Sequence, residues 1–349
     1  MSRPIGINEF LVLRKEIPLI DVRSPGEFEQ GHIPGAINIP LFDNEERAIV
    51  GTLFKKSGQK DAILAGLDIA GIKMRNLAEK ALKTAQNKEL IVHCWRGGMR
   101  SSSMAWLFET CGIKCHILKG GYKAYRNYAH EYYARPFKLL VIGGMTGSGK
   151  TAILDEIEKR SLQVLNLEKI AHHKGSAFGN LGESPQDTNE QFENNLFEAL
   201  SLLKPEETVF LEDESMNIGY NIIPPEFFRT MSLSPLIVIE MDKDQRVGRL
   251  VEDYGKYTRE ELRACLEKIS KRLGGLNTKL AINSLENGNI AEAAALSLYY
   301  YDKAYSNGLL RKTNSKIITV SVNSPDAEIN AMKILEILKT GNLISTLTD

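Results

Sequence analysis

A cysteine in a short glycine-containing segment is the first part of the sequence that could do chemistry. Cys94 follows the apolar run LIVH and precedes Arg96, Gly97, Gly98 and Arg100. If a strand ends at the cysteine and a helix starts after the loop, loop amides and the positive end of the helix point at the sulfur, and both arginines add charge. We therefore expect a thiolate with a pKa below the free value of about 8.5, able to attack a phosphorus, sulfur or selenium centre.

The other cysteines carry no such pattern. An isolated cysteine is more often a buried thiol than a nucleophile, and Cys111, Cys115 and Cys265 lie in ordinary helix or strand patterns. None of the cysteines forms a CxxC pair or a metal-ligand spacing with histidine. We expect free thiols and no structural metal site.

A second candidate site is the segment VIGGMTGSGKT, which has the spacing GxxxxGKT between an apolar run and a helical pattern. In this context the motif forms a phosphate-binding loop (P-loop): backbone amides surround a phosphate, the lysine contacts its oxygens and the threonine can reach Mg²⁺. ATP or GTP is the usual ligand, but any diphosphate would satisfy these groups. The predicted phosphate-binding residues are Gly144, Gly147, Ser148, Gly149, Lys150 and Thr151.

Acidic residues follow a later apolar run in the segment VFLEDES. Glu212 and Asp213 stand where a carboxylate that orients Mg²⁺ or contacts the P-loop is expected. The alternative is an exposed acidic turn. We expect no tightly bound cofactor.

Two α/β domains are expected from the length of 349 residues and from apolar runs that alternate with helical periodicity. We place them at residues 1–135 and 136–349, because Pro136 disfavours a helical Arg135 and a new strand follows. The second domain should have a helical C-terminal part. The predicted strands are 18–22, 36–39, 90–93, 115–118, 138–142, 163–167, 208–211, 236–241 and 316–322, and the predicted helices are 60–84, 101–110, 122–133, 191–203, 244–254, 259–273 and 290–310.

The formal net charge of zero hides an uneven distribution. Residues 1–137 carry 20 Lys and Arg against 14 Asp and Glu, and the remainder carries 24 against 30. Charge therefore neither requires nor excludes a nucleic-acid partner. The sequence has no apolar run long enough to span a membrane and its start lacks the apolar core of a signal peptide, so we expect a cytoplasmic protein.

Three segments of the first domain resemble the rhodanese family: LIDVRSPGEFEQGHIPGAINIP (19–40), HCWRGGMRS (93–101) and GGYKAYR (120–126). The resemblance implies a rhodanese-like α/β domain followed by a P-loop NTPase-like α/β domain. It also implies that Cys94 carries sulfur or selenium as a persulfide or perselenide.

Acidic and basic side chains of the early rhodanese-like segment have two interpretations. Asp21, Arg23, Glu27 and His32 could act as acid–base groups. We favour the alternative, in which Asp21 and Arg23 form a structural pair.

Two further functional interpretations remain open. Five residues separate Cys94 from Arg100, one more than in the short loop of thiosulfate sulfurtransferases, and HCx5RS also matches tyrosine and dual-specificity phosphatases. A cysteine-dependent phosphatase fused to a kinase-like P-loop domain is therefore an alternative. The third interpretation is a binding module in which the P-loop senses a nucleotide and the rhodanese-like domain is inert or regulatory.

Longer segments, at 45–58, 166–179, 211–219 and 299–305, resemble the tRNA 2-selenouridine synthase family, so that the resemblance covers nearly the whole chain. It implies a two-step conversion of 2-thiouridine to 2-selenouridine at the wobble position of tRNA. Geranyl diphosphate alkylates the sulfur, and selenophosphate then supplies selenium. In this scheme Cys94 carries selenium as a selenylsulfide, and the P-loop holds the diphosphate of geranyl diphosphate or, alternatively, RNA phosphate or a regulatory nucleotide.

The implied tRNA partner requires groups that grip an unstacked anticodon loop. Lys174 departs from the arginine expected in the family, and lysine lacks the bidentate fork of arginine. The candidate RNA-contacting residues are Trp95, Lys123, Arg126 and Lys174, with Tyr122 and Tyr125 as further aromatic candidates.

Overall fold

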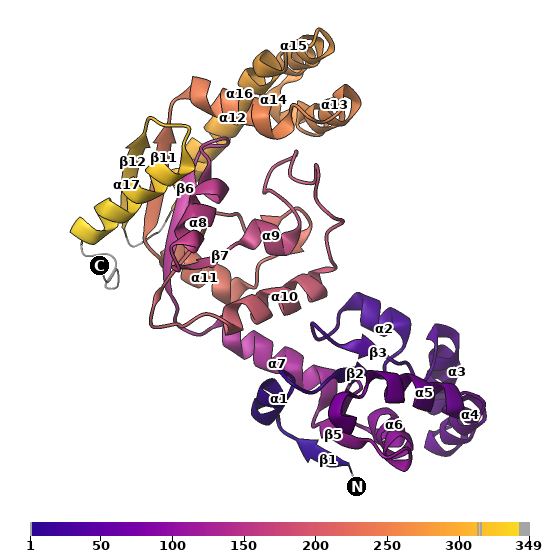
Figure 1. Ribbon diagram of the computed structural model, residues 1–349. Helices are drawn as coiled ribbons and strands as arrows, with labels where there is room; N and C mark the ends of the chain where they lie inside the picture. The colour runs from indigo at the N-terminus through magenta and orange to yellow at the C-terminus, as the bar shows by residue number, and fades with distance from the viewer. Residues whose placement is uncertain (1, 313, 315, 342–349) are drawn as a thin grey trace. The chain divides into compact units, whose positions relative to one another are not determined.

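The chain folds into two compact units, residues 1–132 and 133–349, each built on a parallel sheet (Figure 1). The structure is a computed structural model that describes residues 2–312, 314 and 316–341. Within this described part, no helix is long and apolar enough to cross a membrane. The predicted α/β fold class with parallel sheets is confirmed.

The first unit has a five-stranded sheet in the order β1-β5-β4-β2-β3, and all neighbours are parallel. The central strand carries the apolar sequence that precedes Cys94, and it is buried almost throughout, as expected for the interior of a parallel sheet. The strands are β1 (Arg3–Ile5), β2 (Leu19–Asp21), β3 (Ile37–Asn38), β4 (Glu89–His93) and β5 (Lys114–Leu118). Only β1, three residues at the sheet edge, was not predicted.

Seven α-helices accompany this sheet in the part of the chain that the structure describes: α1 (Ile7–Leu13), α2 (Pro25–Gln30), α3 (Asn44–Lys56), α4 (Gln59–Gly71), α5 (Met74–Thr84), α6 (Met99–Thr110) and α7 (Gly121–Tyr133). The prediction of one helix over 60–84 is wrong, because α4 ends at Gly71 and α5 starts after Lys73. Glycine is a poor helix former, and the Lys73 ammonium bonds Glu46 of α3. After the break, α4 packs against α3 and α5 packs against α6.

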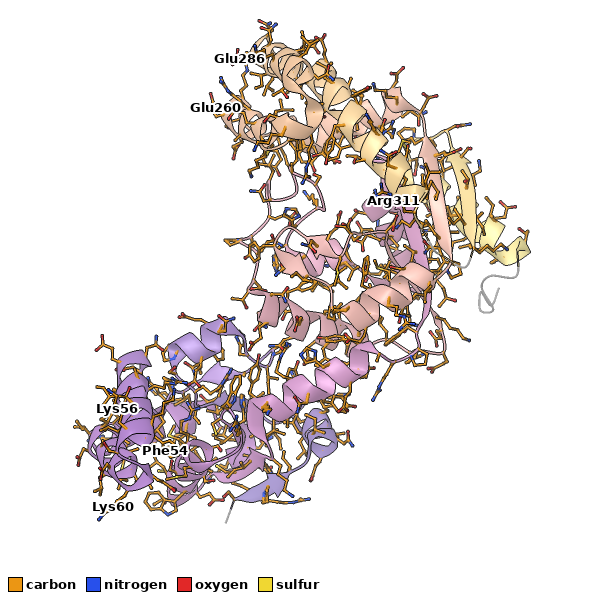
Figure 2. All side chains as sticks on the ribbon, turned by 180° about the vertical axis from the view of Figure 1, so that it is seen from behind. Phe54, Lys56, Lys60, Glu260, Glu286 and Arg311 are labelled. Atoms are coloured by element: carbon orange, nitrogen blue, oxygen red, sulfur yellow. The ribbon has the colours of Figure 1, made fainter. Side chains whose placement is uncertain are left out.

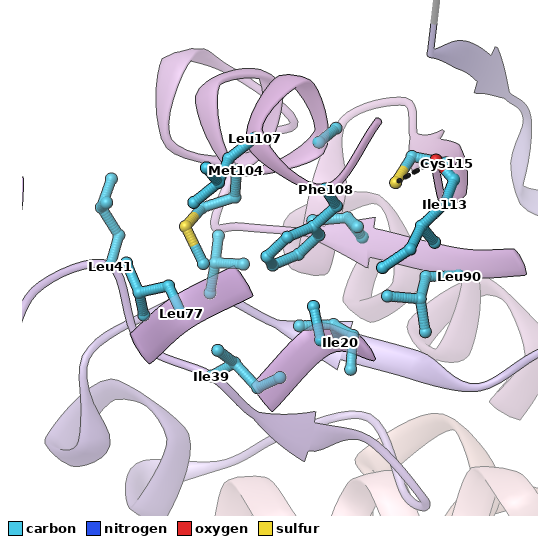
Figure 3. Packing of buried hydrophobic residues seen from close by; sticks show 14 of the residues in the cluster. Ile20, Ile39, Leu41, Leu77, Leu90, Met104, Leu107, Phe108, Ile113 and Cys115 are labelled. Atoms are coloured by element: carbon cyan, nitrogen blue, oxygen red, sulfur yellow. Dashed lines mark hydrogen bonds between the residues drawn. The ribbon is translucent and has the colours of Figure 1, made fainter. Parts of the chain in front are cut away.

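The core of the first unit fixes the two elements that flank Cys94. Phe108 of α6 is fully buried in one cluster with Ile20 of β2 and Leu90 of β4 (Figure 3). Leu77 of α5 packs in the same cluster. Close packing of this kind resists displacement of one element against another, so the end of β4 and the start of α6 hold the loop between them in place.

The second unit has a sheet in the order β12-β11-β6-β8-β7, again with parallel neighbours. The strand before the P-loop, β6, is central, so the loop emerges where sites form in open α/β sheets. The strands are β6 (Lys138–Gly144), β7 (Gln163–Leu165), β8 (Thr208–Glu212), β11 (Leu236–Met241) and β12 (Ile317–Val322), and a separate antiparallel pair consists of β9 (Asn217–Ile218) and β10 (Asn221–Ile222).

The helices of the second unit include a helical part with its own core. Leu262, Leu266 and Leu285 lie in this core, and so does Ile269, where the predicted helix 259–273 divides into two. The helices are α8 (Lys150–Lys159), α9 (Leu167–Ala171), α10 (Asn189–Ser201), α11 (Pro225–Leu233), α12 (Lys243–Tyr254), α13 (Arg259–Lys268), α14 (Ser270–Leu273), α15 (Gly275–Glu286), α16 (Ile290–Leu309) and α17 (Ala327–Thr340).

Candidate functional site

The sulfur of Cys94 lies in a loop that runs from the end of β4 to the start of α6. Its side chain is almost completely buried, with an exposed fraction of 4%. The Gly98 amide donates to Sγ at 3.3 Å, and the Ser101 hydroxyl lies 3.3 Å from Sγ. Burial raises the pKa of the Cys94 thiol, but hydrogen bonds from the Ser101 side chain and from the amides of Arg96, Gly98 and Ser101 outweigh it and hold the pKa below its ordinary value. The loop amides and the Ser101 hydroxyl therefore favour the thiolate, whereas the side-chain charges of Arg96 and Arg100 are not among the largest causes of the lowered pKa.

The first residues of α7 form hydrogen bonds to this loop. The amides of Tyr122 and Lys123 donate to the carbonyl oxygens of Cys94 and Trp95 at 2.9 and 3.0 Å. Gly121 has a φ of +59°, and a Cβ there would collide with the Cys94 carbonyl. The segment GGYK is thus a structural partner of the cysteine loop, a relationship that sequence spacing does not reveal.

The arginine at the end of the loop is paired with a carboxylate of α2. Arg100 donates to Glu27 at 2.7 and 3.3 Å, and Arg47 lies 3.7 Å from the same carboxylate. Burial raises the pKa of Glu27, but the hydrogen bond and charge of Arg100 hold it below its usual value. Arg100 is therefore positioned by Glu27, whereas Arg96 and Gly97 occupy the loop itself.

A fully buried ion pair braces the strand end beside the loop. Arg23 Nη2 donates to Asp21 Oδ2 at 2.6 Å and to the Gly31 carbonyl at 2.7 Å, and its guanidinium lies 4.0 Å from the centre of the Tyr122 ring. Burial raises the pKa of Asp21, but His93 and Arg23 together lower it by a larger amount. The pKa is therefore below its ordinary value and the carboxyl remains ionised. This geometry agrees with the predicted structural pair.

The aromatic candidates for RNA contact separate into exposed and buried groups. Tyr122 and Tyr125 are fully buried, with ring centres 6.3 Å apart, and cannot stack on bases. The sequence interpretation of these two residues is wrong because their helix face packs into the core. Trp95 is 37% exposed and Lys123 is exposed.

The remaining candidate RNA contacts are polar. Arg126 is half-buried and lies 3.2 Å from His130. Lys174 of the second unit is 41% exposed and pairs with Glu183 at 3.2 Å. Both retain a positive charge at a surface, although each has a local partner.

The P-loop of the second unit joins β6 to α8. Gly147 and Gly149 have φ values of +81° and +78°, in the region that favours glycine. Lys150 reaches back across the loop and donates to the Gly144 carbonyl at 3.0 Å. Ser148 is fully buried, and its hydroxyl has no hydrogen-bond partner among the described residues. The loop therefore gathers lysine, hydroxyl and amide donors, as a phosphate site requires.

Carboxylates lie beside the P-loop. Thr151 donates to Glu168 at 3.2 Å, and the Leu167 amide donates to Glu212 at 3.0 Å. Burial, with repulsion from Glu168, raises the pKa of Glu212 to about 8 and also raises the pKa of Glu214. The charge of Lys150 opposes both shifts.

Asp213 contacts a different part of the second unit. Its carboxylate bonds the Lys312 ammonium, and its amide donates to the Ile142 carbonyl at 2.8 Å. The structure thus brings Glu212 towards the P-loop lysine and engages Asp213 with the segment before β12.

Comparison with known proteins identifies the family. A tRNA 2-selenouridine synthase of Nitrosomonas europaea is 35% identical, with 88% of this chain and 93% of the relative covered. This chain belongs to the tRNA 2-selenouridine synthase family. A second member, from Bdellovibrio bacteriovorus, is also 35% identical, over 86% of this chain and 91% of the relative. The family model of the tRNA 2-selenouridine synthase AAA domain matches residues 137–327, and that of the rhodanese-like domain matches residues 8–128.

Two arginines of α12 contact the P-loop of this tRNA 2-selenouridine synthase family member, and sequence analysis missed both. A Cβ on Gly149 would lie 2.8 Å from Arg249 Cζ. Arg246 is 3% exposed, forms a bidentate pair with Asp302 at 2.7 and 2.8 Å, and donates to the Thr146 carbonyl at 3.2 Å. Their spacing of three residues places them on one helix face, but only the packing of α12 aims that face at the loop.

The oxygen donors of the P-loop suit a Mg²⁺ shared with a phosphate. In the described part of the chain, no three His, Cys, Asp or Glu side chains are grouped as a metal site. Mg²⁺ at phosphate sites commonly takes only one or two protein ligands, with phosphate oxygens and water completing its shell. The Thr151 hydroxyl and the Glu168 carboxylate, 3.2 Å apart, fit that donor set.

Proposed function

We propose that this protein converts 2-thiouridine at the wobble position of tRNA to 2-selenouridine through an S-geranyl-2-thiouridine intermediate. The observation that supports the proposal is the presence of two different loops that gather hydrogen-bond donors, one around the Cys94 sulfur and one that contains Lys150. The first suits displacement at a carbon or selenium centre, and the second suits a diphosphate. The relatives' name, tRNA 2-selenouridine synthase, supports tRNA as the substrate.

The first step belongs to the P-loop. The sulfur of 2-thiouridine attacks the first carbon of geranyl diphosphate, a carbon–sulfur bond forms, and the carbon–oxygen bond breaks with its electron pair leaving on diphosphate. The uridine loses its N3 proton. Lys150, the loop amides and the N-terminal end of α8 stabilise the charge that develops on the leaving group. Gly144, Gly147, Ser148, Gly149 and Thr151 complete the loop.

Mg²⁺ is an expected co-factor of this step rather than a structural metal. Thr151 and Glu168 would hold it, and it would neutralise charge on the diphosphate. The raised pKa values of Glu212 and Glu214 reflect carboxylates crowded in a buried place, and positive charge added beside them would favour their ionised forms.

The second step belongs to Cys94. The thiolate adds to C2 of the geranylated base and expels geranylthiolate, which takes a proton from water. Selenium of selenophosphate then adds at C2 and expels the Cys94 thiolate, and water cleaves the selenium–phosphorus bond to give phosphate and 2-selenouridine. Atoms and electrons balance without an oxidant or reductant.

The selenylsulfide implied by the rhodanese resemblance is a different route. The selenylsulfide is two electrons more oxidised than a thiolate together with selenophosphate. Its formation with phosphate as the other product would require a two-electron oxidant, and release of 2-selenouridine from it would require a thiol reductant. We therefore favour the redox-neutral route. Intact-mass measurement separates the two: a gain of one selenium atom on the protein with selenophosphate alone would overturn our choice, and a Cys94–RNA adduct would support it.

The test of the overall function uses mass spectrometry of nucleosides from 2-thiouridine tRNA incubated with geranyl diphosphate and then selenophosphate. Cys94→Ala should accumulate the geranylated nucleoside, and Lys150→Ala should lower geranylation by about a hundredfold. Cys115→Ala, a buried thiol of the same unit, and Lys159→Ala, at the far end of α8, are the matched controls. Normal geranylation by Lys150→Ala, or selenouridine formation by Cys94→Ala, would remove that residue from the mechanism.

The phosphatase alternative makes the opposite prediction. It requires turnover of p-nitrophenyl phosphate that is lost in Cys94→Ala. We expect negligible turnover by the wild-type protein, because the reaction proposed for Cys94 is displacement at C2 of the base and not hydrolysis of a phosphate ester.

A further inference from the structure

A large apolar cavity adjoins Cys94 in the first unit. Its volume is about 880 Å³, within the range of roughly 300–1,000 Å³ that is usual for small-molecule sites. Helices α3, α4, α5 and α6 and the loop before α6 surround it, and Cys94 is part of its wall. Its apolar lining includes Phe42, Val50, Ile63, Met74, Met104 and Leu107.

The same cavity is bordered by large apolar side chains that remain exposed to solvent. Phe54 is 57% exposed, Leu67 62%, Met99 56% and Trp106 59%, and Figure 2 labels Phe54 on α3. A single exposed apolar residue is ordinary, but several around one cavity mark a surface that a ligand covers. The first unit therefore has an apolar site that suits a ligand from outside this unit.

Basic side chains also line this cavity. They are Arg47, Lys55, Arg96 and Arg100, of which Arg47 and Arg100 contact Glu27. An apolar interior with cations around it suits a ligand that joins a hydrocarbon chain to a polyanion, and RNA phosphates supply the polyanion. A purely polar nucleotide would leave the apolar lining in contact with water, and a free hydrocarbon would leave the cations unused.

The geometry points to a binding pocket for the geranyl chain of S-geranylated tRNA during the selenium-transfer step, an inference that rests on the proposed function. The geranyl group is bonded to the sulfur that must leave C2. A geranyl group bound in the cavity would therefore place C2 next to the Cys94 thiolate in the cavity wall. Binding energy from a part of the substrate that does not react is then used to orient the reacting atoms. Free geranyl diphosphate stays with the P-loop, and the cavity selects the alkylated base.

The test compares selenation of tRNA anticodon stem-loops that carry S-geranyl- or S-methyl-2-thiouridine, with the full-length protein. Phe54→Gln/Leu67→Gln places polar amides at the cavity and leaves the charge unchanged. Its matched control is Ile49→Gln/Leu64→Gln, since these residues lie on the same two helices, are 53% exposed each, and do not line the cavity. The readout is the ratio of kcat/KM for the two substrates.

Wild-type protein and the control should both prefer the geranylated substrate, and Phe54→Gln/Leu67→Gln should lower this preference by about tenfold, equivalent to about 1.4 kcal/mol. A Cys94→Ala background, in which Kd replaces kcat/KM, should give the same change in binding preference. Circular dichroism checks that both double variants are folded.

Three results would overturn the inference. Equal selenation of both substrates by the wild-type protein would remove the pocket while the proposed function stands. If Phe54→Gln/Leu67→Gln lost geranylation but kept the wild-type preference for the S-geranylated substrate in selenation, the cavity would be assigned to geranyl diphosphate. Failure of the wild-type protein to selenate either substrate would overturn the proposed function and the pocket together.

Discussion

Arg100 donates to both carboxylate oxygens of Glu27, with Nη1 2.7 Å from Oε2 and Nη2 3.3 Å from Oε1. The pair joins the first turn of α6 to α2, two segments more than 70 residues apart, at the edge of the Cys94 loop. Glu27 also accepts from the Ser24 amide at 3.2 Å and so completes the cap of α2. One carboxylate therefore fixes the loop arginine and a helix start together.

Glu27→Gln should destabilise the protein and increase the reactivity of Cys94. Loss of the charged hydrogen bonds should cost about 2 kcal/mol of unfolding free energy, measured by urea denaturation. The uncompensated Arg100 charge should also lower the pKa of Cys94, seen as alkylation persisting to lower pH. Glu29→Gln, an exposed residue of the same helix, is the control. Unchanged stability in Glu27→Gln would mean that the pair contributes nothing.

The pH dependence of alkylation by iodoacetamide should show that Cys94 ionises at a lower pH than an ordinary thiol. Because the pKa of Cys94 is lowered, the titration midpoint should fall below the ordinary value of about 8.5. Ser101→Ala removes a hydrogen bond to Sγ and should move the midpoint upwards. A Cys111→Ala background removes the exposed thiol.

Cys115 provides an internal control for that titration. Burial raises its pKa to about 12, so it should stay unmodified at neutral pH. A Cys94 midpoint at or above the ordinary thiol value would contradict the proposed role of the loop amides.

Gly121→Ala should impair selenium transfer by displacing the Cys94 loop. Its Cβ would collide with the Cys94 carbonyl in addition to the strain of a left-handed backbone. Gly112→Ala is the matched control, because Gly112 has a φ of +82° and a Cβ at that position would have no neighbouring atom within 4 Å. Both variants should lose about 1 kcal/mol from backbone strain, whereas only Gly121→Ala should slow conversion of pre-geranylated tRNA. Equal rates in the two variants would remove this contact from the mechanism.

Glu212→Gln should flatten the pH dependence of stability. The pKa of Glu212 is raised to about 8 in the folded protein, whereas an unfolded glutamate titrates near 4.3. Between these values the folded state binds more protons, so the stability that this proton contributes declines as pH rises, by up to about 1.4 kcal/mol per pH unit. Glutamine does not titrate and can still accept from the Leu167 amide.

Urea denaturation of the full chain at pH 5, 6, 7 and 8 measures this slope. The exposed Glu206→Gln serves as the control and should retain the wild-type slope. A Glu212→Gln variant with that same slope would show that Glu212 is not protonated in the folded protein.

The sequence by itself determined the positions of the two candidate loops and the family. Cys94 and Lys150 could be placed because each loop is a continuous strand-loop-helix segment, whose geometry depends on residues adjacent in the chain. The interior strands β4 and β6 were also predicted, since continuous apolar runs are typical of parallel sheets. The helix break at Ile72 was not predicted, because the helical period of the sequence continues across it.

Only the tertiary structure decided which distant side chains complete each loop. Glu27 reaches Arg100, Gly121 supports Cys94 and Arg249 covers Gly149. The apolar cavity beside Cys94 likewise arises from helices α3 and α4, whose exposed apolar residues look like ordinary surface in the sequence. Local propensity and spacing act over a few residues, whereas these contacts depend on how separate helices pack, and that is fixed only when the whole core forms.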